Sequence, residues 1–510
     1  MTGLHFCPLF SRYHIKKRKL KLPHKYLRTV RLISLFFSTI MSWNSSKATS
    51  SITTKLEKEE CSLVDILTDD NLKIAFKKRI PKLVDFLLDN IDQIIDIALG
   101  VEVIDQDILT QNEMKSVCFS LIVNQVKSFT GLLISNDSFL SHLDSFITND
   151  KEIDEDSVTG FARIFQFLLQ QSNGNILNRW PNRDYLYEKI LKHHDKIAVH
   201  VLLEDLSNDG RKPVVAFLED NHASNVLLDF IHNNMNQGTI LKNIKLFNYL
   251  ANIVSGIEID SPLLFAFESV DTMKEIYELA INTPNRQLSA QIFNFLNKVA
   301  EQCDIDDGDE RNEEEEEEED PLITSVIKYG YNNLENIIEH IQKRTPFLSD
   351  CEHATRLVNT ILLRSEMIPQ CVYDYTRYLF EGIFENPAHS ILHQSFSMLF
   401  EIIMTEQDKC SEFVKNCNMK YRIQEVYEKR YQIIANYWGL LFNLSNKIND
   451  IISTNKDDED WQNFKNIVLT KTQTILNVEY GGKLPSESDQ SDSEEIEFPL
   501  GRSQLVNYNE

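Results

Sequence analysis

The sequence predicts an all-α protein built from many amphipathic helices, and three observations lead to this fold class. Only 15 Gly and 13 Pro occur in 510 residues, which is little turn-forming material for a chain of short strands. Apolar residues recur at steps of three to five positions through several long segments, as they do on one face of a helix. No segment shows the sustained alternation of apolar and polar residues that marks a half-buried strand.

Residues 81–100, PKLVDFLLDNIDQIIDIALG, carry the clearest helical pattern. Acidic residues fall largely on the side opposite the apolar stripe, as an exposed face requires. Gly100 is expected to end this helix, because glycine adopts the left-handed conformation of a helix terminus without strain. The apolar stripe consists of Leu83, Leu87, Ile91, Ile94 and Leu99, and the acidic side of Asp85, Asp92 and Asp96.

Two further segments extend the helical prediction. Residues 239–256 begin at Thr239, a residue suited to capping, and end at Gly256. Their predicted buried stripe is Ile240, Ile244, Phe247, Leu250 and Val254. Residues 270–302 predict two helices joined at Thr283-Pro284-Asn285, because proline disfavours helical backbone at the residue before it.

Helix pairs with short breaks recur over 61–303 and again over 321–485, although no strict sequence repeat is visible. A chain of this length rarely closes into one bundle. Stacked helix pairs would bury each apolar face against its neighbour, so we predict a helical solenoid of the HEAT or armadillo kind in two blocks.

The segments outside these blocks differ in composition. Residues 304–320, DIDDGDERNEEEEEEED, predict a disordered acidic loop, with a solvated helix as the alternative. Residues 486–510 predict a disordered, acidic, Ser-rich tail, in which Ser486 and Ser491 each have an acid three residues later. Residues 41–60 form a Ser-rich link. Residues 1–40 contain nine Lys or Arg and no acid, and we expect them to lie outside the fold.

Charge limits the classes of partner. The net charge is −25, and without the nine bases of residues 1–40 it is −25 − 9 = −34. So acidic a body repels phosphate backbones and anionic membranes, which argues against nucleic acid and membrane as ligands and suits basic protein partners. The eight cysteines contain no CxxC pair, as expected for reduced thiols in a cytoplasmic protein.

No residue pattern predicts catalysis, a cofactor or a metal, so we expect a protein that is not an enzyme. Glycine-rich phosphate loops, HExxH and GxSxG are all absent from the sequence. His389 and His393 lie four apart and could share a metal, but no carboxylate or cysteine at a helpful spacing joins them, which favours surface histidines. His193-His194 cannot form a catalytic dyad alone. Cys410 and Cys417 share a helical face, a spacing more typical of packing.

Four stretches resemble the SAPS-domain family, the Sit-four-associated regulatory subunits of the type-six Ser/Thr protein phosphatase. Residues 41–88 resemble the family's opening, through Met41-Ser42-Trp43, the run 62–70 (SLVDILTDD) and the run 82–87 (KLVDFL). Ser42 replaces the family's usual Phe. Residues 161–206 resemble a later segment through Ile190-Leu191-Lys192-His193, Asp195, Ala198 and Leu202-Leu203.

The other two stretches lie near the end of the chain. Residues 435–451 are similar to a family element through Tyr437, Gly439, Leu441, Asn446-Lys447 and Ile448. Residues 460–485 are similar to the last element of the family's sequence pattern, through Trp461, Phe464, Leu469, Asn477 and Gly481-Gly482. The four stretches occur in the family's order and bracket almost all of residues 41–485, whereas residues 210–430 match only loosely.

The resemblance implies a non-catalytic regulatory subunit, located in the cytoplasm or also the nucleus, that binds a type-six phosphatase catalytic subunit and directs its substrate choice or location. The chain lacks the GDxHG, GDxVDRG and GNHE signatures with which such phosphatases hold their metals. Two alternatives remain: a generic armadillo-like adaptor for transport or scaffolding, and an acidic chaperone for basic proteins. The family's start falls on Met41, so residues 1–40 are expected to be an upstream extension, with a targeting peptide as the alternative.

Overall fold

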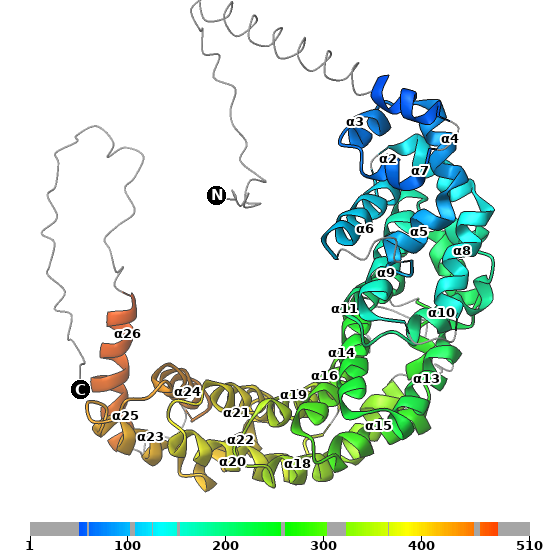
Figure 1. The fold of residues 1–510 in the computed structure, drawn as a ribbon. Helices are drawn as coiled ribbons and strands as arrows, with labels where there is room; N and C mark the ends of the chain where they lie inside the picture. Colours follow the sequence, from blue (N-terminus) through cyan, green and yellow to red (C-terminus); the bar gives the residue numbers. More distant parts are fainter. Residues whose placement is uncertain are drawn as a thin grey trace, which may run out of the picture. The chain divides into compact units, whose positions relative to one another are not determined.

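Every regular element of the protein is a helix in the computed structural model, which describes residues 50–58, 61–102, 108–124, 126–149, 153–256, 261–302, 323–365, 367–452 and 459–477 (Figure 1). No strand occurs in these residues. The predicted all-α fold class is therefore confirmed. The chain divides into two compact units, Met1–Thr272 and Met273–Glu510.

The first unit starts with a helix over residues 50–56 and continues through thirteen α-helices and two short 3₁₀ segments among its described residues. They are α2 (Leu63–Leu67), α3 (Leu72–Lys77), α4 (Pro81–Asp89), α5 (Ile91–Leu99), α6 (Ile108–Ile122), α7 (Lys127–Ser135), α8 (Asp137–Thr148), α9 (Glu155–Gln171), η1 (Asn175–Arg179), α10 (Arg183–Leu191), α11 (Ile197–Ser207), α12 (Lys212–Asp220), α13 (Ala223–Gln237), α14 (Ile240–Gly256) and η2 (Leu264–Phe267). Helix α15 (Val270–Asn282) begins just before the division of the chain.

The second unit is built in the same way from helices of up to four or five turns. They are α16 (Arg286–Gln302), η3 (Ile323–Lys328), α17 (Tyr329–Asn332), α18 (Leu334–Gln342), α19 (Ser349–Leu363), α20 (Gln370–Glu385), α21 (Ser390–Ile403), α22 (Gln407–Asn416), α23 (Met419–Glu428), α24 (Trp438–Ile452), α25 (Glu459–Phe464), η4 (Lys465–Leu469) and α26 (Thr470–Asn477).

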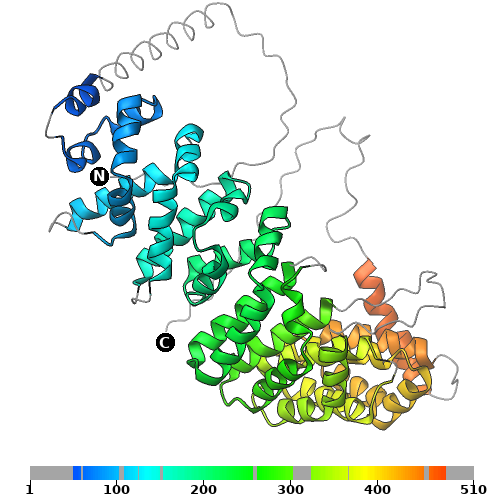
Figure 2. The same cartoon turned by 90° about the vertical axis from the view of Figure 1, so that its right-hand side faces the viewer.

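Within each unit the helices stack in two rows, as Figures 1 and 2 show. In the first unit α6, α9, α11 and α14 pack in succession, and α5, α8, α10 and α13 form the second row. In the second unit α16, α19 and α21 pack in succession beside α18 and α20. Since each helix buries its apolar face against the next pair, the arrangement in each unit is the predicted armadillo-like solenoid.

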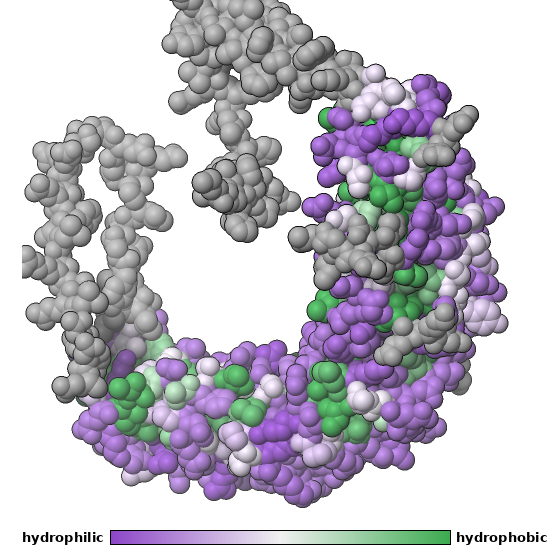
Figure 3. All heavy atoms as spheres, viewed as in Figure 1, coloured by the Kyte–Doolittle hydropathy of each residue, from purple (hydrophilic) through white to green (hydrophobic). Residues whose placement is uncertain are grey.

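The surface follows from this stacking. On the face seen in Figure 3, hydrophobic residues gather in separate patches between hydrophilic ones in the part of the chain that the structure describes. Single exposed apolar side chains are common on the helices of soluble proteins. Exposed apolar side chains that cluster beside a hollow are better candidates for contact with a partner protein. No single described helix is long and apolar enough to span a membrane.

The helix predicted over 81–100 is two helices, α4 and α5, broken at Asn90. Asn90 has φ −107° and ψ 19°, and its side-chain amide donates a hydrogen bond to the Phe86 carbonyl at 2.7 Å. Asparagine competes for backbone groups in this way and so interrupts a helix. All five residues of the predicted stripe are buried, and Gly100 ends α5 at φ 79°, as predicted.

The segments 239–256 and 270–302 match their predictions except at two residues of the predicted stripe, Ile240 and Ile244, of which Ile244 is only half-buried. Thr239 Oγ1 accepts a hydrogen bond from the Lys242 amide at 3.3 Å and caps α14. Helices α15 and α16 end and begin on either side of Thr283-Pro284-Asn285. Ile240, by contrast, is 51% exposed, because the buried face of α14 starts one turn later, at Asn243.

Several predicted segments lie outside the described residues: 1–40, most of 41–60, the acidic run 304–320 and the tail 486–510. Helix α16 ends at Gln302, directly before the acidic run, and packs closely against α19, which follows the run. Helices from both sides of the run therefore belong to the second unit. The two units themselves divide between Thr272 and Met273.

Candidate protein-binding surfaces

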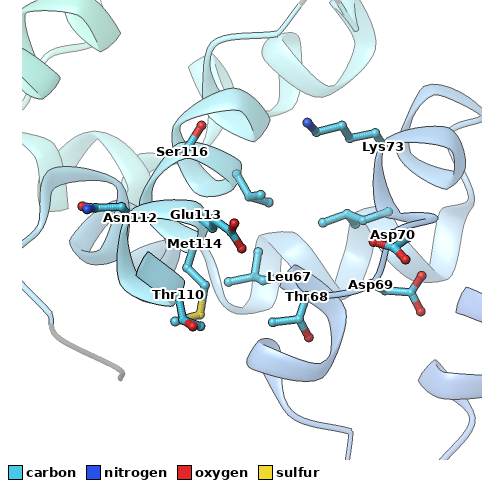
Figure 4. A pocket seen from close by; sticks show the side chains of 12 residues that line it. Leu67, Thr68, Asp69, Asp70, Lys73, Thr110, Asn112, Glu113, Met114 and Ser116 are labelled. Carbon is cyan, nitrogen blue, oxygen red and sulfur yellow. The ribbon is translucent and has the colours of Figure 1, made fainter. Parts of the chain in front are cut away.

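A groove runs between α3 and α6 in the first unit, and we call it the N-terminal groove. It consists of two hollows that share Leu72, Lys73 and Val117. Figure 4 shows the first hollow, where Leu67, Thr68, Asp69, Asp70 and Lys73 face Thr110, Asn112, Glu113, Met114 and Ser116 of the helix opposite. The second hollow continues past Phe76 and Lys77 to Arg79.

Local hydrogen bonds fix the wall that carries α2 and α3. Ser62 and Asp65 form a capping box at the start of α2: the Ser62 hydroxyl accepts from the Asp65 amide at 3.2 Å, and the Asp65 carboxylate accepts from the Ser62 amide at 3.2 Å. Asp69 then closes the turn into α3, since its carboxylate accepts from the Asn71 amide at 2.8 Å and pairs with Lys55 Nζ at 2.6 Å.

The floor of the N-terminal groove is apolar. Leu72 and Phe76 of α3 and Met114 and Leu121 of α6 are all buried, and they leave only polar or partly exposed residues on the rims. Phe76 is held by an edge-to-face contact with Phe129, with ring centroids 4.9 Å apart. A fixed apolar floor between polar rims is the usual form of a site that takes a peptide or a side chain of a partner.

The two ends of the groove carry opposite charge. Asp69, Asp70 and Glu113 line the first hollow, Lys77 and Arg79 line the second, and Lys73 lies where the two hollows meet. Within the described part of the chain, no ion pair or side-chain hydrogen bond engages Lys73, Lys77 or Arg79. Three unpaired cations lie together here on a strongly acidic chain, which marks this wall as a place for an anionic partner.

The backbone at Arg79 is unusual. Its φ is 55°, the left-handed region that costs a residue with a side chain about 1 kcal/mol. This conformation turns the chain between α3 and α4, which begins at Pro81. The turn ends the groove at its basic side.

A second candidate surface lies between α9 and α11, and we call it the α9–α11 face. Ile197 is 77% exposed and Val201 is 41% exposed, one helical turn apart on α11. They line a hollow together with Asp154, Glu155 and Asp156 at the start of α9. Asp154 caps α9, accepting from the Ser157 amide at 3.0 Å, and Lys196 lies 3.7 Å from Glu155. The face is thus apolar at its centre and acidic at its edge.

The histidines singled out in the sequence have structural partners. His389 Nε2 lies 2.8 Å from the Phe347 carbonyl oxygen, and His389 Nδ1 accepts from the Leu392 amide at 3.2 Å. His393 is buried, with Nε2 3.1 Å from the Asn386 carbonyl oxygen. Both nitrogens of His389 are therefore occupied in holding a helix terminus. Among the described residues no group of three His, Cys, Asp or Glu is placed to hold a metal ion.

His193 and His194 lie in the turn after α10, not together in a pocket. His194 is buried, with Nε2 3.3 Å from the Lys242 carbonyl oxygen and its ring edge-to-face against Phe230. Burial lowers the pKa of both His193 and His194, so each is held toward its neutral form. Asp195 accepts a hydrogen bond from Lys245 through its backbone carbonyl. These contacts tie α10 to α14.

The cysteines and Trp461 also serve packing. Cys410 and Cys417 are buried at the two ends of α22, and burial raises the pKa of each thiol to about 11. Trp461 is buried and donates its indole N–H to Asn449 Oδ1 at 2.7 Å, so it anchors α25 to α24. None of these residues meets another in a common site.

Sequence reasoning missed both candidate surfaces. A usable signal for the N-terminal groove was present in the segment 72–82, LKIAFKKRIPK, where five bases occur without an acid in an otherwise acidic chain. The α9–α11 face had no comparable signal, because Ile197 and Val201 follow helical spacing like any buried stripe. Comparisons with protein-family models, with curated proteins and with solved structures give no match for this chain.

Proposed function

We propose that the protein is a non-catalytic regulatory subunit that binds a type-six, Sit-four-like Ser/Thr protein phosphatase catalytic subunit and directs its substrate choice or location. The observation that carries the proposal is the order of the four stretches that resemble the SAPS-domain family along residues 41–485. The all-helical, armadillo-like architecture supports it, since stacked helices offer extended surfaces to a globular partner.

The α9–α11 face is the contact that we propose for the catalytic subunit. Its apolar centre, Ile197 and Val201, lies within the second resembling stretch, residues 161–206, whereas its acidic edge at residues 154–156 precedes that stretch. A helix of a solenoid normally buries its large aliphatic residues, so exposed Ile197 and Val201 beside a hollow are suited to a partner's apolar side chain. The acidic edge would direct basic residues of the partner toward that centre.

The same fold suits a generic adaptor, and the acidic run 304–320 suits a chaperone of basic proteins. An affinity capture of the full tagged chain from cells, followed by mass spectrometry, separates the three functions. Under the proposal a type-six catalytic subunit is recovered in near-stoichiometric amount, both from the full chain and from a chain without residues 304–320. Recovery of transport factors or histones, with no phosphatase subunit above background, would rule it out.

A further inference from the structure

On the basis of the proposed function, we propose that the α9–α11 face binds an amphipathic α-helix of the catalytic subunit, about three turns long, which lies along the groove between α9 and α11. This helix places a basic residue at the acidic end of the groove and an acidic residue at the other end. The length of the groove, the backbone of its walls and the position of its charges all favour a helix of this kind.

Two side-chain contacts connect α9 and α11 along the groove. Lys196, directly before α11, lies 3.7 Å from Glu155 in the first turn of α9. Further along, Gln166 of α9 donates a hydrogen bond to Asp205 of α11. The two helices therefore run in the same direction. The groove between these contacts is about 16 Å long, because residues 155 and 166 are eleven positions apart at roughly 1.5 Å per residue.

The centre of the groove is apolar and open to solvent. Ile197 is 77% exposed and Val201 is 41% exposed, four positions apart on α11. Ala198 and Thr159 line the same hollow, and their small side chains leave space for an aliphatic residue of a partner. Side chains four positions apart form a ridge along a helix, and such a ridge packs into the grooves of a second helix.

The walls of the groove offer side chains only. Glu155–Gln171 and Ile197–Ser207 are continuous α-helices, in which backbone amides and carbonyls bond to one another except at the helix ends. An extended peptide over Ile197 and Val201 would leave its own backbone groups without partners beside apolar side chains, which costs free energy. A helix satisfies its backbone internally, so a helix is the element that fits between α9 and α11.

The two ends of the groove differ in charge. Asp154, Glu155 and Asp156 lie where α9 begins, and Lys196 neutralises only part of their charge. Arg163 is exposed and lines the groove about two turns further along α9. In the described part of the chain, no ion pair engages Asp156 or Arg163. A partner helix is therefore expected to place Lys or Arg near Asp156, and Asp or Glu near Arg163.

The spacing of these charges predicts a pattern in the partner helix. Asp156 and Arg163 are seven positions apart on α9, which is about 10 Å along the helix axis. A basic and an acidic residue seven positions apart on the partner helix span the same distance. An aliphatic residue between them, three or four positions from each, lies on the same face of that helix and would contact Ile197 and Val201.

Hydrogen exchange of the purified type-six catalytic subunit, alone and bound to the full-length chain, identifies the element that contacts the α9–α11 face. We expect protection of a helix that carries the base, the aliphatic residue and the acid at these positions. Ile197→Asp with Val201→Asp should abolish this protection. The proposal would be overturned if the protection that these two substitutions abolish lay in an extended segment or in a helix without the charge pattern, or if they abolished none.

Charge reversal tests the pairing itself. In isothermal titration calorimetry, Asp156→Arg and Arg163→Glu should each weaken the complex at least about fivefold. Asp184→Arg and Lys212→Glu, at exposed positions of α10 and α12, are the matched controls and should not weaken it. Reversal of the basic residue of the protected helix to Glu should also weaken the complex, and Asp156→Arg should then restore it. Restoration would show in addition that Asp156→Arg leaves the fold intact, whereas its absence would overturn the proposal.

The outcomes separate the partner helix from the proposed function. The absence of any complex with the wild-type chain would rule out both. A complex that Ile197→Asp with Val201→Asp weakens, but that Asp156→Arg and Arg163→Glu leave unchanged, would agree with the proposed function and overturn only the helix with this charge pattern.

Discussion

Arg286 holds the carboxylate of Asp350 with two hydrogen bonds, Nε to Oδ2 at 2.8 Å and Nη2 to Oδ1 at 2.7 Å. Asp350 is fully buried, and Arg344 Nη1 lies 3.2 Å from Oδ2 on the other side. Arg286 starts α16, before the acidic run, and Asp350 lies in the first turn of α19, which follows η3, α17 and α18 after the run, so this pair joins two helices from opposite sides of the run in the sequence. Both arginines also donate to backbone carbonyls, at Pro346 and Thr283.

Asp350→Asn should destabilise the second unit by about 3 kcal/mol, because the loss of a buried carboxylate leaves two guanidinium groups without their counter-charge. Urea unfolding followed by circular dichroism measures this change. Asp374→Asn, at an exposed position of α20, is the matched control and should change stability by less than about 0.5 kcal/mol. If Asp350→Asn and Asp374→Asn lowered the free energy of unfolding by similar amounts, the role assigned to Asp350 would be contradicted.

The same pair predicts a dependence on pH. Burial raises the pKa of the Asp350 carboxyl, but hydrogen bonds and charge from Arg286 and a hydrogen bond from Arg344 outweigh it, so the pKa lies below its ordinary value. A lowered native pKa contributes stability that is complete above the unfolded pKa, about 3.9, and is lost as pH falls through the native pKa. The stability difference between wild type and Asp350→Asn should therefore narrow below about pH 4. A stability difference between wild type and Asp350→Asn that stays constant down to pH 3 would contradict the lowered pKa of Asp350.

The buried thiols predict slow alkylation. Burial raises the pKa of Cys410 and Cys417 to about 11 and that of Cys118 to about 12, and only the thiolate reacts. At pH 8 these three cysteines should react with iodoacetamide at least about a hundredfold more slowly in the native chain than in urea. Peptide mapping of the labelled sites provides the measurement. Rapid native labelling of Cys410 or Cys417 would show that they do not pack as described.

The capping box at α2 predicts a local effect beside the N-terminal groove. Ser62→Ala removes the acceptor for the Asp65 amide and should destabilise the start of the first unit by about 1 kcal/mol. Hydrogen exchange of the Asp65 amide should accelerate accordingly, whereas Ser120→Ala on the exposed side of α6 should leave it unchanged. Ser62→Thr keeps a hydroxyl and should restore most of the protection. Unchanged exchange in Ser62→Ala would refute the cap.

Much of the fold was predictable because local signals agree with packing. Thr239 capped α14 as predicted, and the break at Thr283-Pro284-Asn285 followed from the restriction that proline imposes. The sequence did not predict the break at Asn90, because the apolar periodicity continues across this residue. The helix is interrupted there by the hydrogen bond from the Asn90 side-chain amide to the Phe86 carbonyl. Ile240 shows that periodicity gives the buried face of a helix but not how far neighbouring helices extend along it.

The candidate surfaces were less predictable for a related reason. Ile197 and Val201 have the spacing of core residues, and only the position of α9 leaves them exposed. The apolar floor at Leu72 and Phe76 likewise forms only when α6 packs opposite α3. The prediction that His389 and His393 are surface histidines is wrong for His393, which is buried with its Nε2 3.1 Å from the Asn386 carbonyl oxygen. His389 is half-buried at the start of α21.

Direct binding of the purified full-length chain to a purified type-six phosphatase catalytic subunit tests the central proposal most directly. By isothermal titration calorimetry we expect a one-to-one complex that Ile197→Asp with Val201→Asp weakens at least about tenfold. Leu132→Asp with Leu363→Asp, at similarly exposed apolar positions, should bind like wild type. The absence of any complex with the wild-type chain would contradict the proposed function. A complex that Ile197→Asp with Val201→Asp leaves unchanged would contradict only its placement on the α9–α11 face.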